Sequence, residues 1–332
     1  MDRVEPAKKV SLIAFCSAKG GVGKSTLSVA CAHVLASPDA PVVVVDADMT
    51  GTSLADGLSL CAPRLVSSAE GILDFNQVPE AHLSAEATRQ LQARHRRGLG
   101  TSLPFLNHAL LATRDESDRP KLRAQALLWR EAGQDSSVSY IPSSSTQDDV
   151  GVALRWLYTE DEPKRWVCHL AWVLRALVND VPNLRAVVID LPPGLFGFTQ
   201  ATLSLLAHLR KGWSLPNGFP PLLDGSVSWD VKPILVLSAD RNDLVVGADY
   251  FAKVKAQDRL PGLIPAVNAL TEAPEVIRKR LGEDAALELG VGEALRTVDR
   301  DDLLAMIFKR QRLELTGEAR KSVKALLELD NE

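Results

Sequence analysis

A glycine-rich turn near the N-terminus holds the residues best suited to chemistry. It reads Lys19-Gly20-Gly21-Val22-Gly23-Lys24-Ser25-Thr26 and lies between an apolar run and a predicted helix. Glycines let consecutive backbone N–H groups point into the turn, and the helix adds its own unsatisfied N–H groups and its dipole. Such a turn cradles phosphate, with Lys24 reaching the β and γ phosphates and the Ser25 hydroxyl on Mg²⁺. The sequence therefore predicts a nucleotide-binding loop.

Three aspartates follow two further apolar runs. Asp46 and Asp48 come directly after residues 42–45, and Asp190 follows residues 186–189. Carboxylates at the carboxyl end of a strand beside a phosphate loop lie where a metal shell or an attacking water needs an acceptor. An apolar strand that ends in aspartate is also the usual layout for a carboxylate that holds Mg²⁺ in phosphoryl transfer. The alternative interpretation is that these are solvated turn residues.

Short apolar runs recur along the chain with helical stretches between them. They span residues 10–15, 41–45, 138–141, 186–189, 233–237 and 263–267. This alternation is typical of a parallel sheet covered on both faces, because each crossover connection lays a helix over the sheet. We predict an α/β fold with a doubly wound, mostly parallel sheet and helices on both faces, whose ligands bind at the carboxyl ends of the strands.

The whole chain, residues 1–332, is predicted to form one domain with helical additions. In residues 163–181 apolar side chains recur at three- and four-residue steps, which predicts a core helix. Between residues 76 and 137 this periodicity weakens and charged residues gather, so we interpret this segment as a largely helical insertion. A C-terminal helical segment is expected at about residues 300–330, and residues 212–230 form a Gly-, Pro- and Trp-rich loop.

Composition and charge narrow the classes of protein. A hydrophobic fraction of 46% and a charged fraction of 24% fit a chain that buries a large core. The net charge of -4 gives no global attraction to nucleic acid or anionic lipid, so any such contact must be local. The first apolar run is too short to span a bilayer. The four cysteines, Cys16, Cys31, Cys61 and Cys168, are scattered, as expected of reduced thiols in a cytoplasmic protein.

The order of residues in the loop resembles that of one family of nucleotide-binding proteins. The general P-loop pattern has a glycine at the position of Ala18, whereas here a lysine stands directly before paired glycines. This arrangement resembles the deviant Walker A motif of the ParA/MinD family. The resemblance implies a P-loop ATPase domain that binds ATP and Mg²⁺ through residues 19–26, and it implies that Lys19 reaches across a dimer to the partner's nucleotide.

Further motifs match the same family in the same order. Asp46-Ala47-Asp48 resembles its D-x-D switch I, which implies that Asp48 orients the attacking water while Asp46 helps to hold the magnesium shell or the loop. Asp190-Leu191-Pro192-Pro193-Gly194 resembles its switch II, with Asp190 on Mg²⁺. Two matches are weaker. Pro142-Ser143-Ser144 resembles the family's P-[AS]-S loop or is an ordinary polar loop, and Asn268 stands where members place a base-contacting asparagine.

The resemblance implies an ATP-dependent switch. Such a protein forms a homodimer when it binds ATP, hydrolyses ATP slowly with Lys19, Lys24 and Asp48, and acts on a regulatory or cargo protein. The alternative is an ATP-dependent small-molecule ligase or synthetase on the same fold, which would need an acceptor pocket. A metal-cluster carrier is disfavoured because the cysteines are scattered.

Two other kinds of partner have local sequence signals. Basic groups at residues 94–97, 278–280 and 309–312 could contact DNA phosphates, although most charge runs are solvated helix faces. Residues 303–308, followed by Lys309 and Arg310, resemble an amphipathic membrane helix. A further helical stretch follows them, so packing against the sheet is the preferred interpretation and no membrane attachment is expected.

Overall fold

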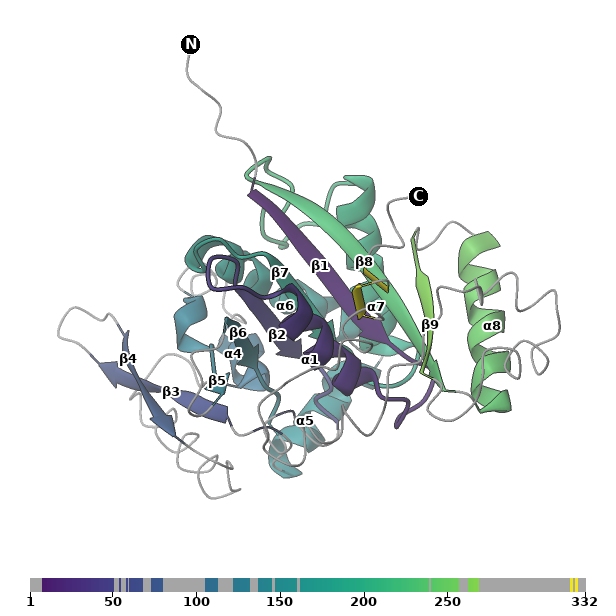
Figure 1. The fold of residues 1–332 in the computed structure, drawn as a ribbon, viewed down its shortest axis with the longest axis horizontal. Helices are drawn as coiled ribbons and strands as arrows, with labels where there is room; N and C mark the ends of the chain where they lie inside the picture. Colours follow the sequence, from purple (N-terminus) through teal and green to yellow (C-terminus); the bar gives the residue numbers. More distant parts are fainter. Residues whose placement is uncertain are drawn as a thin grey trace, which may run out of the picture.

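A six-stranded sheet forms the centre of the computed structural model (Figure 1). The structure describes residues 8–50, 54, 58, 60–67, 73–79, 105–112, 122–131, 137–144, 147–159, 162–238, 240–256, 262–268, 323, 324, 326 and 327. All neighbouring strands of this sheet pair in parallel. Their order is β6 (Val138–Ile141), β2 (Val42–Asp46), β7 (Ala186–Asp190), β1 (Lys8–Cys16), β8 (Val227–Ser238) and β9 (Ile264–Asn268).

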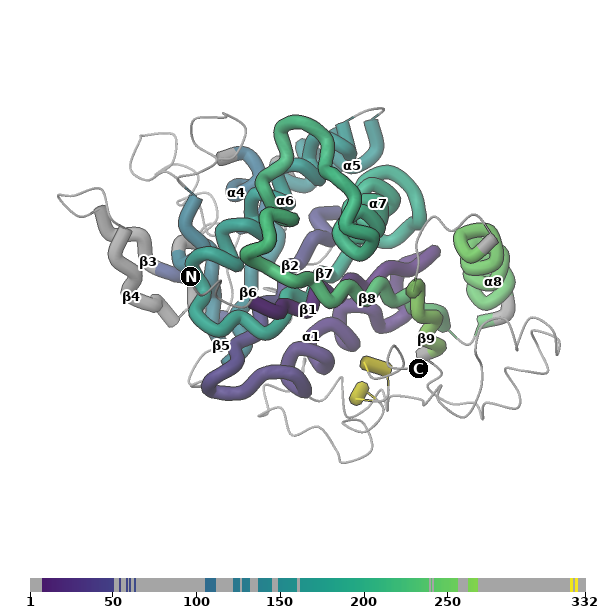
Figure 2. The backbone as a smooth tube through the Cα atoms, turned by 90° about the horizontal axis from the view of Figure 1, so that it is seen from above, coloured from purple at the N-terminus to yellow at the C-terminus, as the bar shows by residue number. Residues whose placement is uncertain are grey.

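Helices cover both faces of the sheet, which confirms the predicted doubly wound α/β fold. Viewed from above, α1 (Lys24–Leu35) lies on one side, and α6 (Glu162–Asp180) and α7 (Gly197–Lys211) lie on the other (Figure 2). Side chains of β1 divide between two cores, because successive residues of a strand point to opposite faces. Ile13 and Phe15 pack with α1, whereas Leu12 and Ala14 pack with α6 and α7.

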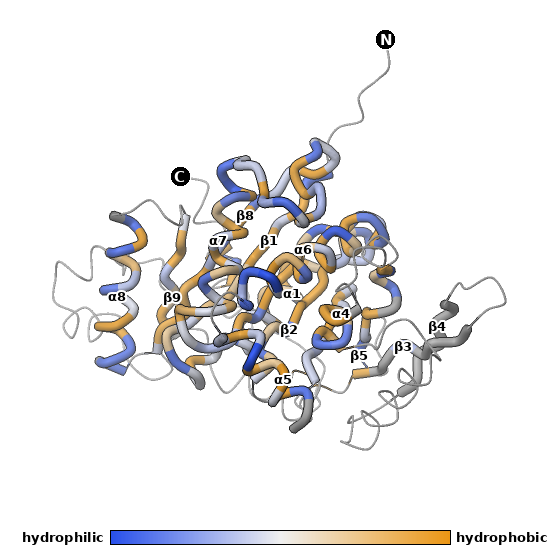
Figure 3. The backbone as a smooth tube through the Cα atoms, turned by 180° about the vertical axis from the view of Figure 1, so that it is seen from behind, coloured by the Kyte–Doolittle hydropathy of each residue, from blue (hydrophilic) through white to orange (hydrophobic). Residues whose placement is uncertain are grey.

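The apolar runs of the sequence become the buried strands (Figure 3). Every residue of β2 and β7 is buried, as expected for central parallel strands covered on both faces. The predicted core helix is α6, whose buried residues include Trp166, Leu170 and Leu177. Strand β8 begins at Val227, earlier than the predicted 233, because it pairs with β1 along the whole length of that strand.

The remaining elements lie around this central sheet. They are α4 (Leu106–Ala112), the 3-10 helix η2 (Ala124–Ala126), α5 (Gln147–Tyr158) and α8 (Arg241–Ala256), which lies beside β8 and β9 at one edge (Figure 1). A second, antiparallel sheet has the order β4 (Leu73–Pro79), β3 (Leu60–Ser67), β5 (Arg130–Glu131). Most of the predicted helical insertion, 76–137, and most of the predicted helical segment at 300–330 lie outside the described residues, so both stay predictions. Within the described part of the chain, no helix has the length and apolar character needed to cross a membrane.

Candidate functional site

The glycine-rich turn joins the end of β1 to the start of α1 in a conformation that favours glycine. Gly21 and Gly23 have φ of 76° and 86°, values that favour glycine. Nothing lies within 4 Å of the place where a side chain would begin at Gly20 or Gly21, so the turn is open. Helix α1 starts at Lys24 without a side-chain cap and without an acidic residue in its first turn. Its unsatisfied N–H groups and dipole are therefore ready for an anion.

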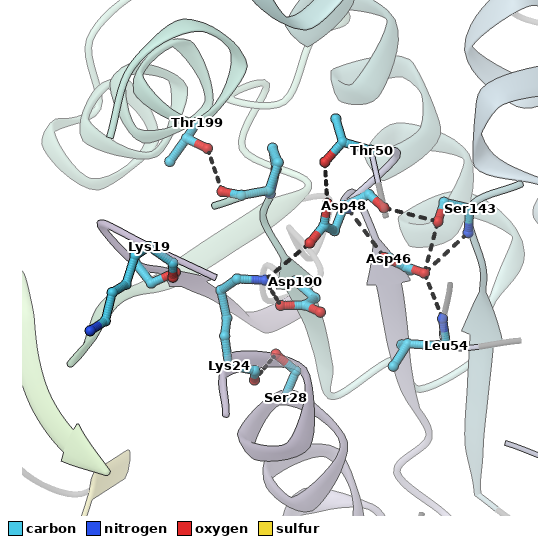
Figure 4. A network of polar contacts seen from close by, with 12 residues as sticks. Lys19, Lys24, Ser28, Asp46, Asp48, Thr50, Leu54, Ser143, Asp190 and Thr199 are labelled. Atoms are coloured by element: carbon cyan, nitrogen blue, oxygen red, sulfur yellow. Dashed lines mark hydrogen bonds and ion pairs between the residues drawn. The ribbon is translucent and has the colours of Figure 1, made fainter. Parts of the chain in front are cut away.

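Lys24 lies at the centre of a buried group of charges, with only 6% of its side chain exposed. Its Nζ atom is 2.7 Å from Asp190 Oδ1 and 3.8 Å from Asp48 Oδ2 (Figure 4). Burial by itself lowers the pKa of the ammonium, but Asp190 and then Asp48 raise that pKa above its ordinary value. Lys24 is consequently a fixed positive charge at the mouth of the loop.

Asp190 ends β7, and the register of the sheet brings it beside the loop and the other aspartates. It pairs with Phe15 of β1 on one side and with Asp46 of β2 on the other. Its Oδ1 atom accepts the bond from Lys24, whereas its buried Oδ2 atom has no hydrogen-bond partner among the described residues. A buried, unpartnered carboxylate oxygen has a high cost in free energy unless a ligand satisfies it, so Asp190 fits a role as an acceptor for hydrated Mg²⁺.

Asp48 is less buried than Asp190 and faces Lys24. Its Oδ1 atom accepts a 2.8 Å hydrogen bond from the Thr50 hydroxyl. Burial raises the pKa of this carboxyl, and Lys24 opposes that rise without cancelling it. A partly exposed carboxylate held in one orientation beside the phosphate loop can accept a proton or orient water, which is the role predicted for Asp48.

Both carboxylate oxygens of Asp46 accept hydrogen bonds from neighbouring segments of the chain. Its Oδ2 atom accepts bonds from the Leu54 backbone N–H (2.9 Å), the Ser143 hydroxyl (2.9 Å) and the Ser143 N–H (3.3 Å), and its Oδ1 accepts from the Asp48 N–H (3.2 Å). Burial first and Asp190 second raise its pKa to about 7, while the bonds from Leu54 and Ser143 oppose the shift. Of the two roles predicted for Asp46, these contacts favour positioning the loop over binding magnesium.

Lys19 lies apart from this group and is exposed. In Figure 4 its side chain points away from Lys24 and Asp190. Its Nζ atom is 3.3 Å from Asp240 Oδ1, and both side chains are about half exposed, at 45% and 53%. Asp240 also accepts bonds from the N–H groups of Asn242 and Asp243 at the start of α8. The sequence does not predict this pairing, because Asp240 lies 221 positions from Lys19, just after β8. The one available signal is that an aspartate directly before a helix is a recognisable cap.

The Pro192-Pro193-Gly194 turn after Asp190 is fastened to the end of β1. The Gly194 N–H donates to Ser17 O (2.9 Å), and the Thr199 hydroxyl of α7 donates to Pro192 O (3.0 Å; Figure 4). Gly194 has φ of 99°, and a side chain there would meet the Phe196 ring at 2.7 Å. The turn therefore links Asp190 to α7 by close packing.

The other predicted site residues take up the expected backbone positions. Ser25 and Thr26 lie in the first turn of α1, directly after Lys24, and Val22 is a buried residue of the turn. Asn268 ends β9, so it lies with the other predicted site residues at the carboxyl ends of the strands. Its side chain lies outside the described residues. The predicted DNA-contacting groups at 94–97, 278–280 and 309–312 and the apolar stretch 303–308 also lie outside the described residues.

Comparisons with known proteins agree with the observed fold. Residues 8–85 match a family model described as ParA, NUBPL iron-transfer P-loop NTPase. These residues include the loop, Asp46 and Asp48. A ParA family ATPase from Chlorobium tepidum is similar in structure, with a TM-score of 0.51, 15% identity, and coverage of 95% of this chain and 98% of that one. No curated relative matches the chain significantly.

A second solved structure was determined with nucleotide. It is an ATP complex of an aspartate-to-alanine variant of Cyanothece McdA, with a TM-score of 0.51 and 14% identity. The alignment covers 98% of this chain and 97% of that one. At these identities the two structures establish the fold, and the family model adds a match that is confined to residues 8–85.

Proposed function

We propose that the chain is a ParA/MinD-like P-loop NTPase that works as an ATP-dependent dimerising switch, and its fold and the family match of residues 8–85 support this proposal. In this proposal the ATP-bound form is a homodimer that controls a regulatory or cargo protein. Slow hydrolysis of ATP then releases the dimer.

The observation that carries this proposal is the placement of Lys24. Its buried ammonium lies between Asp190 and Asp48, directly at the uncapped start of α1. Phosphoryl transfer to water needs positioned charges and a positioned water more than it needs covalent chemistry by the protein. The loop N–H groups and Lys24 would hold the triphosphate, Asp48 would orient the water, and Asp190 with Ser25 would hold Mg²⁺. The bound Mg²⁺ would supply charge neutralisation between the phosphate groups.

Lys19 has a separate role in the proposal. As the side chain is exposed and turned away from its own Lys24, it is available to a second copy of the chain after it leaves Asp240. We therefore propose that Lys19 completes the site of the opposite protomer. This proposal makes hydrolysis depend on dimerisation.

Titration calorimetry with ATP and Mg²⁺ tests the first step. The native protein should bind MgATP, and Lys24→Ala should weaken binding by at least about a hundredfold, because it removes a buried charge-assisted contact to phosphate. Lys211→Ala, which removes a lysine from the far end of α7, is the matched control and should bind like the native protein. Absence of any nucleotide binding by the native protein would overturn the proposal.

Two other activities find less support. A ligase or synthetase needs an acceptor pocket beside the phosphate loop, but an apolar cavity of about 690 Å³ near α7 is lined by none of residues 19–26 and by none of the three aspartates. Iron transfer, named in the description of the family model, would need grouped ligands. Among the described residues no group of three or more His, Cys, Asp or Glu side chains could hold a metal ion, and Cys16 and Cys31 are separately buried.

A further inference from the structure

An apolar cavity lies beside the Pro192-Pro193-Gly194 turn, which we call the switch turn. It lies between α6, α7 and the loop that follows α7. Its volume is about 690 Å³, which is within the range of sites for small organic ligands. Most of its wall is apolar and comes from Val167 of α6, Ala201 and Leu205 of α7, and Leu215 and Phe219 of the loop. The start of the loop predicted at residues 212–230 thus forms one wall of the cavity.

One polar group among the described residues of the wall, the Lys164 ammonium, gives the cavity a positive charge. Lys164 and His208 line it, and no carboxylate is among the described residues that do. Glu162 is near in the chain, but its two oxygens are engaged by Trp166 Nε1 (2.9 Å) and Arg165 (3.5 Å). The His208 Nδ1–H donates to Ser214 O, which fixes the orientation of the ring in the wall. An apolar chamber with a lysine and no carboxylate among its described lining residues is complementary to an amphiphile with an anionic head.

The same cavity touches the residues that control the nucleotide site. Phe196, which is 60% exposed, and Tyr158 both line it, and their rings are 5.5 Å apart. Phe196 packs under the switch turn at Gly194 and directly precedes α7. Burial first and Asp48 second raise the pKa of Tyr158, and Thr50 lowers it, so the Tyr158 hydroxyl lies near Thr50, whose hydroxyl donates to Asp48. A ligand in the cavity would therefore contact Phe196, which packs against the turn after Asp190, and Tyr158, which lies near Asp48.

We propose that this cavity is an effector site for a small amphiphile with an apolar chain and an anionic head, such as a medium-chain carboxylate. The apolar chain packs against Val167, Leu205 and Phe219, and the head lies near Lys164 and His208. Binding fixes Phe196 and Tyr158 and thereby slows ATP hydrolysis. This last step rests on the proposed function, whereas the binding step does not.

Decanoate is the probe for binding, and decyltrimethylammonium is its control with the same apolar chain and the opposite charge. Calorimetry and thermal unfolding are measured without nucleotide and below the concentration at which either probe forms micelles. Decanoate should bind saturably and raise the unfolding temperature, and the cationic probe should bind at least about fivefold more weakly. No binding of decanoate, or equal binding of both probes, would overturn the proposal.

Two variants locate the site. Ala201→Phe fills the cavity from α7 and should abolish decanoate binding, with circular dichroism used to check the fold. Lys164→Gln should weaken decanoate binding by about fivefold. The same change should not weaken binding of the cationic probe. Lys211→Gln is the matched control, because Lys211 lies over the Trp213 ring and does not line the cavity. Unchanged decanoate binding in Ala201→Phe would show that the ligand binds elsewhere.

The coupling to hydrolysis is measured separately. Saturating decanoate should lower the ATP turnover of the native protein by about fivefold, a typical allosteric coupling, and should leave that of Ala201→Phe unchanged. Unchanged or raised turnover of the native protein would overturn the coupling. A protein that binds decanoate but no MgATP would contradict the proposed function while supporting the site, so the two failures are distinguishable.

Discussion

Two groups of buried polar side chains differ in how well their charges are balanced. The aspartate cluster consists of Lys24, Asp46, Asp48 and Asp190 at the carboxyl ends of the central strands. The histidine cluster consists of His33, Glu131 and Tyr140, where the end of α1 meets β5 and β6. The first has three carboxylates around one ammonium, and the second has one carboxylate that accepts bonds from both of its partners.

The pKa shifts follow this difference. In the aspartate cluster, burial and the neighbouring Asp190 raise the pKa of Asp46 to about 7, and Asp190 keeps an unpartnered oxygen. In the histidine cluster, burial raises the pKa of Glu131, but bonds from His33 and Tyr140 lower it below its ordinary value. A surplus of buried negative charge beside an open loop marks a place for a cationic ligand, whereas a closed group of partners marks a structural contact.

Asp48→Ala should have the largest effect on activity. Loss of the group that orients water should lower ATP turnover by about a hundredfold to ten-thousandfold, while MgATP binding persists. Sedimentation with MgATP should then show a stable dimer, because the trapped nucleotide is not hydrolysed. Glu131→Gln in the histidine cluster is the control and should keep native turnover. A purely monomeric Asp48→Ala protein with MgATP bound would contradict the switch.

Lys24→Met should have the largest effect on stability. It leaves the three aspartates without their cation, and breaking such a buried pair costs about 3 kcal/mol. Without Lys24 the pKa of Asp48, already raised by burial, rises further. A raised carboxyl pKa stabilises the fold below the ordinary value of 3.8, and this contribution is lost as the pH rises through the folded-state pKa.

Denaturant unfolding of this variant at about pH 5 and about pH 8 measures the effect. The difference in unfolding free energy between native protein and variant should be greater at the higher pH. An equal difference at both pH values would show that the carboxylates do not repel each other in the fold.

Glu131→Gln should act on stability alone. It removes a charged acceptor from buried bonds to His33 and Tyr140, which should cost about 1–2 kcal/mol above neutral pH. Because the pKa of Glu131 is lowered in the fold, its contribution is present above the ordinary value of 4.5 and is lost as the pH falls through the lower folded-state value. Native protein and variant should therefore approach equal stability in acid. A constant difference down to the lowest pH would contradict the balanced cluster.

Asp240→Asn should have the smallest effect. Asparagine keeps the cap of α8, so only the charge facing Lys19 is lost. The released lysine should increase ATP-dependent dimerisation by less than about fivefold, since exposed ion pairs are weak. Raising the salt concentration should reduce the difference between variant and native protein. Weaker dimerisation in Asp240→Asn would show that Asp240 assists Lys19 instead of holding it back.

Local sequence signals predicted the strands and the loop because both depend on neighbouring residues. The run of four valines in β2 has the β-branched composition of a buried strand, and Gly20, Gly21 and Gly23 suit a turn between a strand and a helix. The start of β8 was missed because Trp229, Asp230 and Lys232 interrupt its apolar pattern, although the strand still pairs with β1.

Contacts between distant segments could not be predicted in the same way. Ser143 holds Asp46 across 97 positions, and Asp240 meets Lys19 only because β8 ends next to β1. The sequence showed that Asp46 is near the loop but could not show that its oxygens are already engaged. The cavity near α7 is also a property of packing, since its wall combines α7 and the loop after it with residues of α6 and the end of α5.

Mixing Lys19→Ala with Asp48→Ala protein and measuring ATP hydrolysis tests most directly whether a second copy completes the site. A mixed dimer would contain one site with its own Asp48 and with Lys19 of the partner subunit. The mixture should then recover roughly a quarter of native turnover, because about half of the dimers are mixed and each has one complete site of two. If the mixture stays as inactive as either variant alone, Lys19 acts within its own chain and the dimeric switch is contradicted.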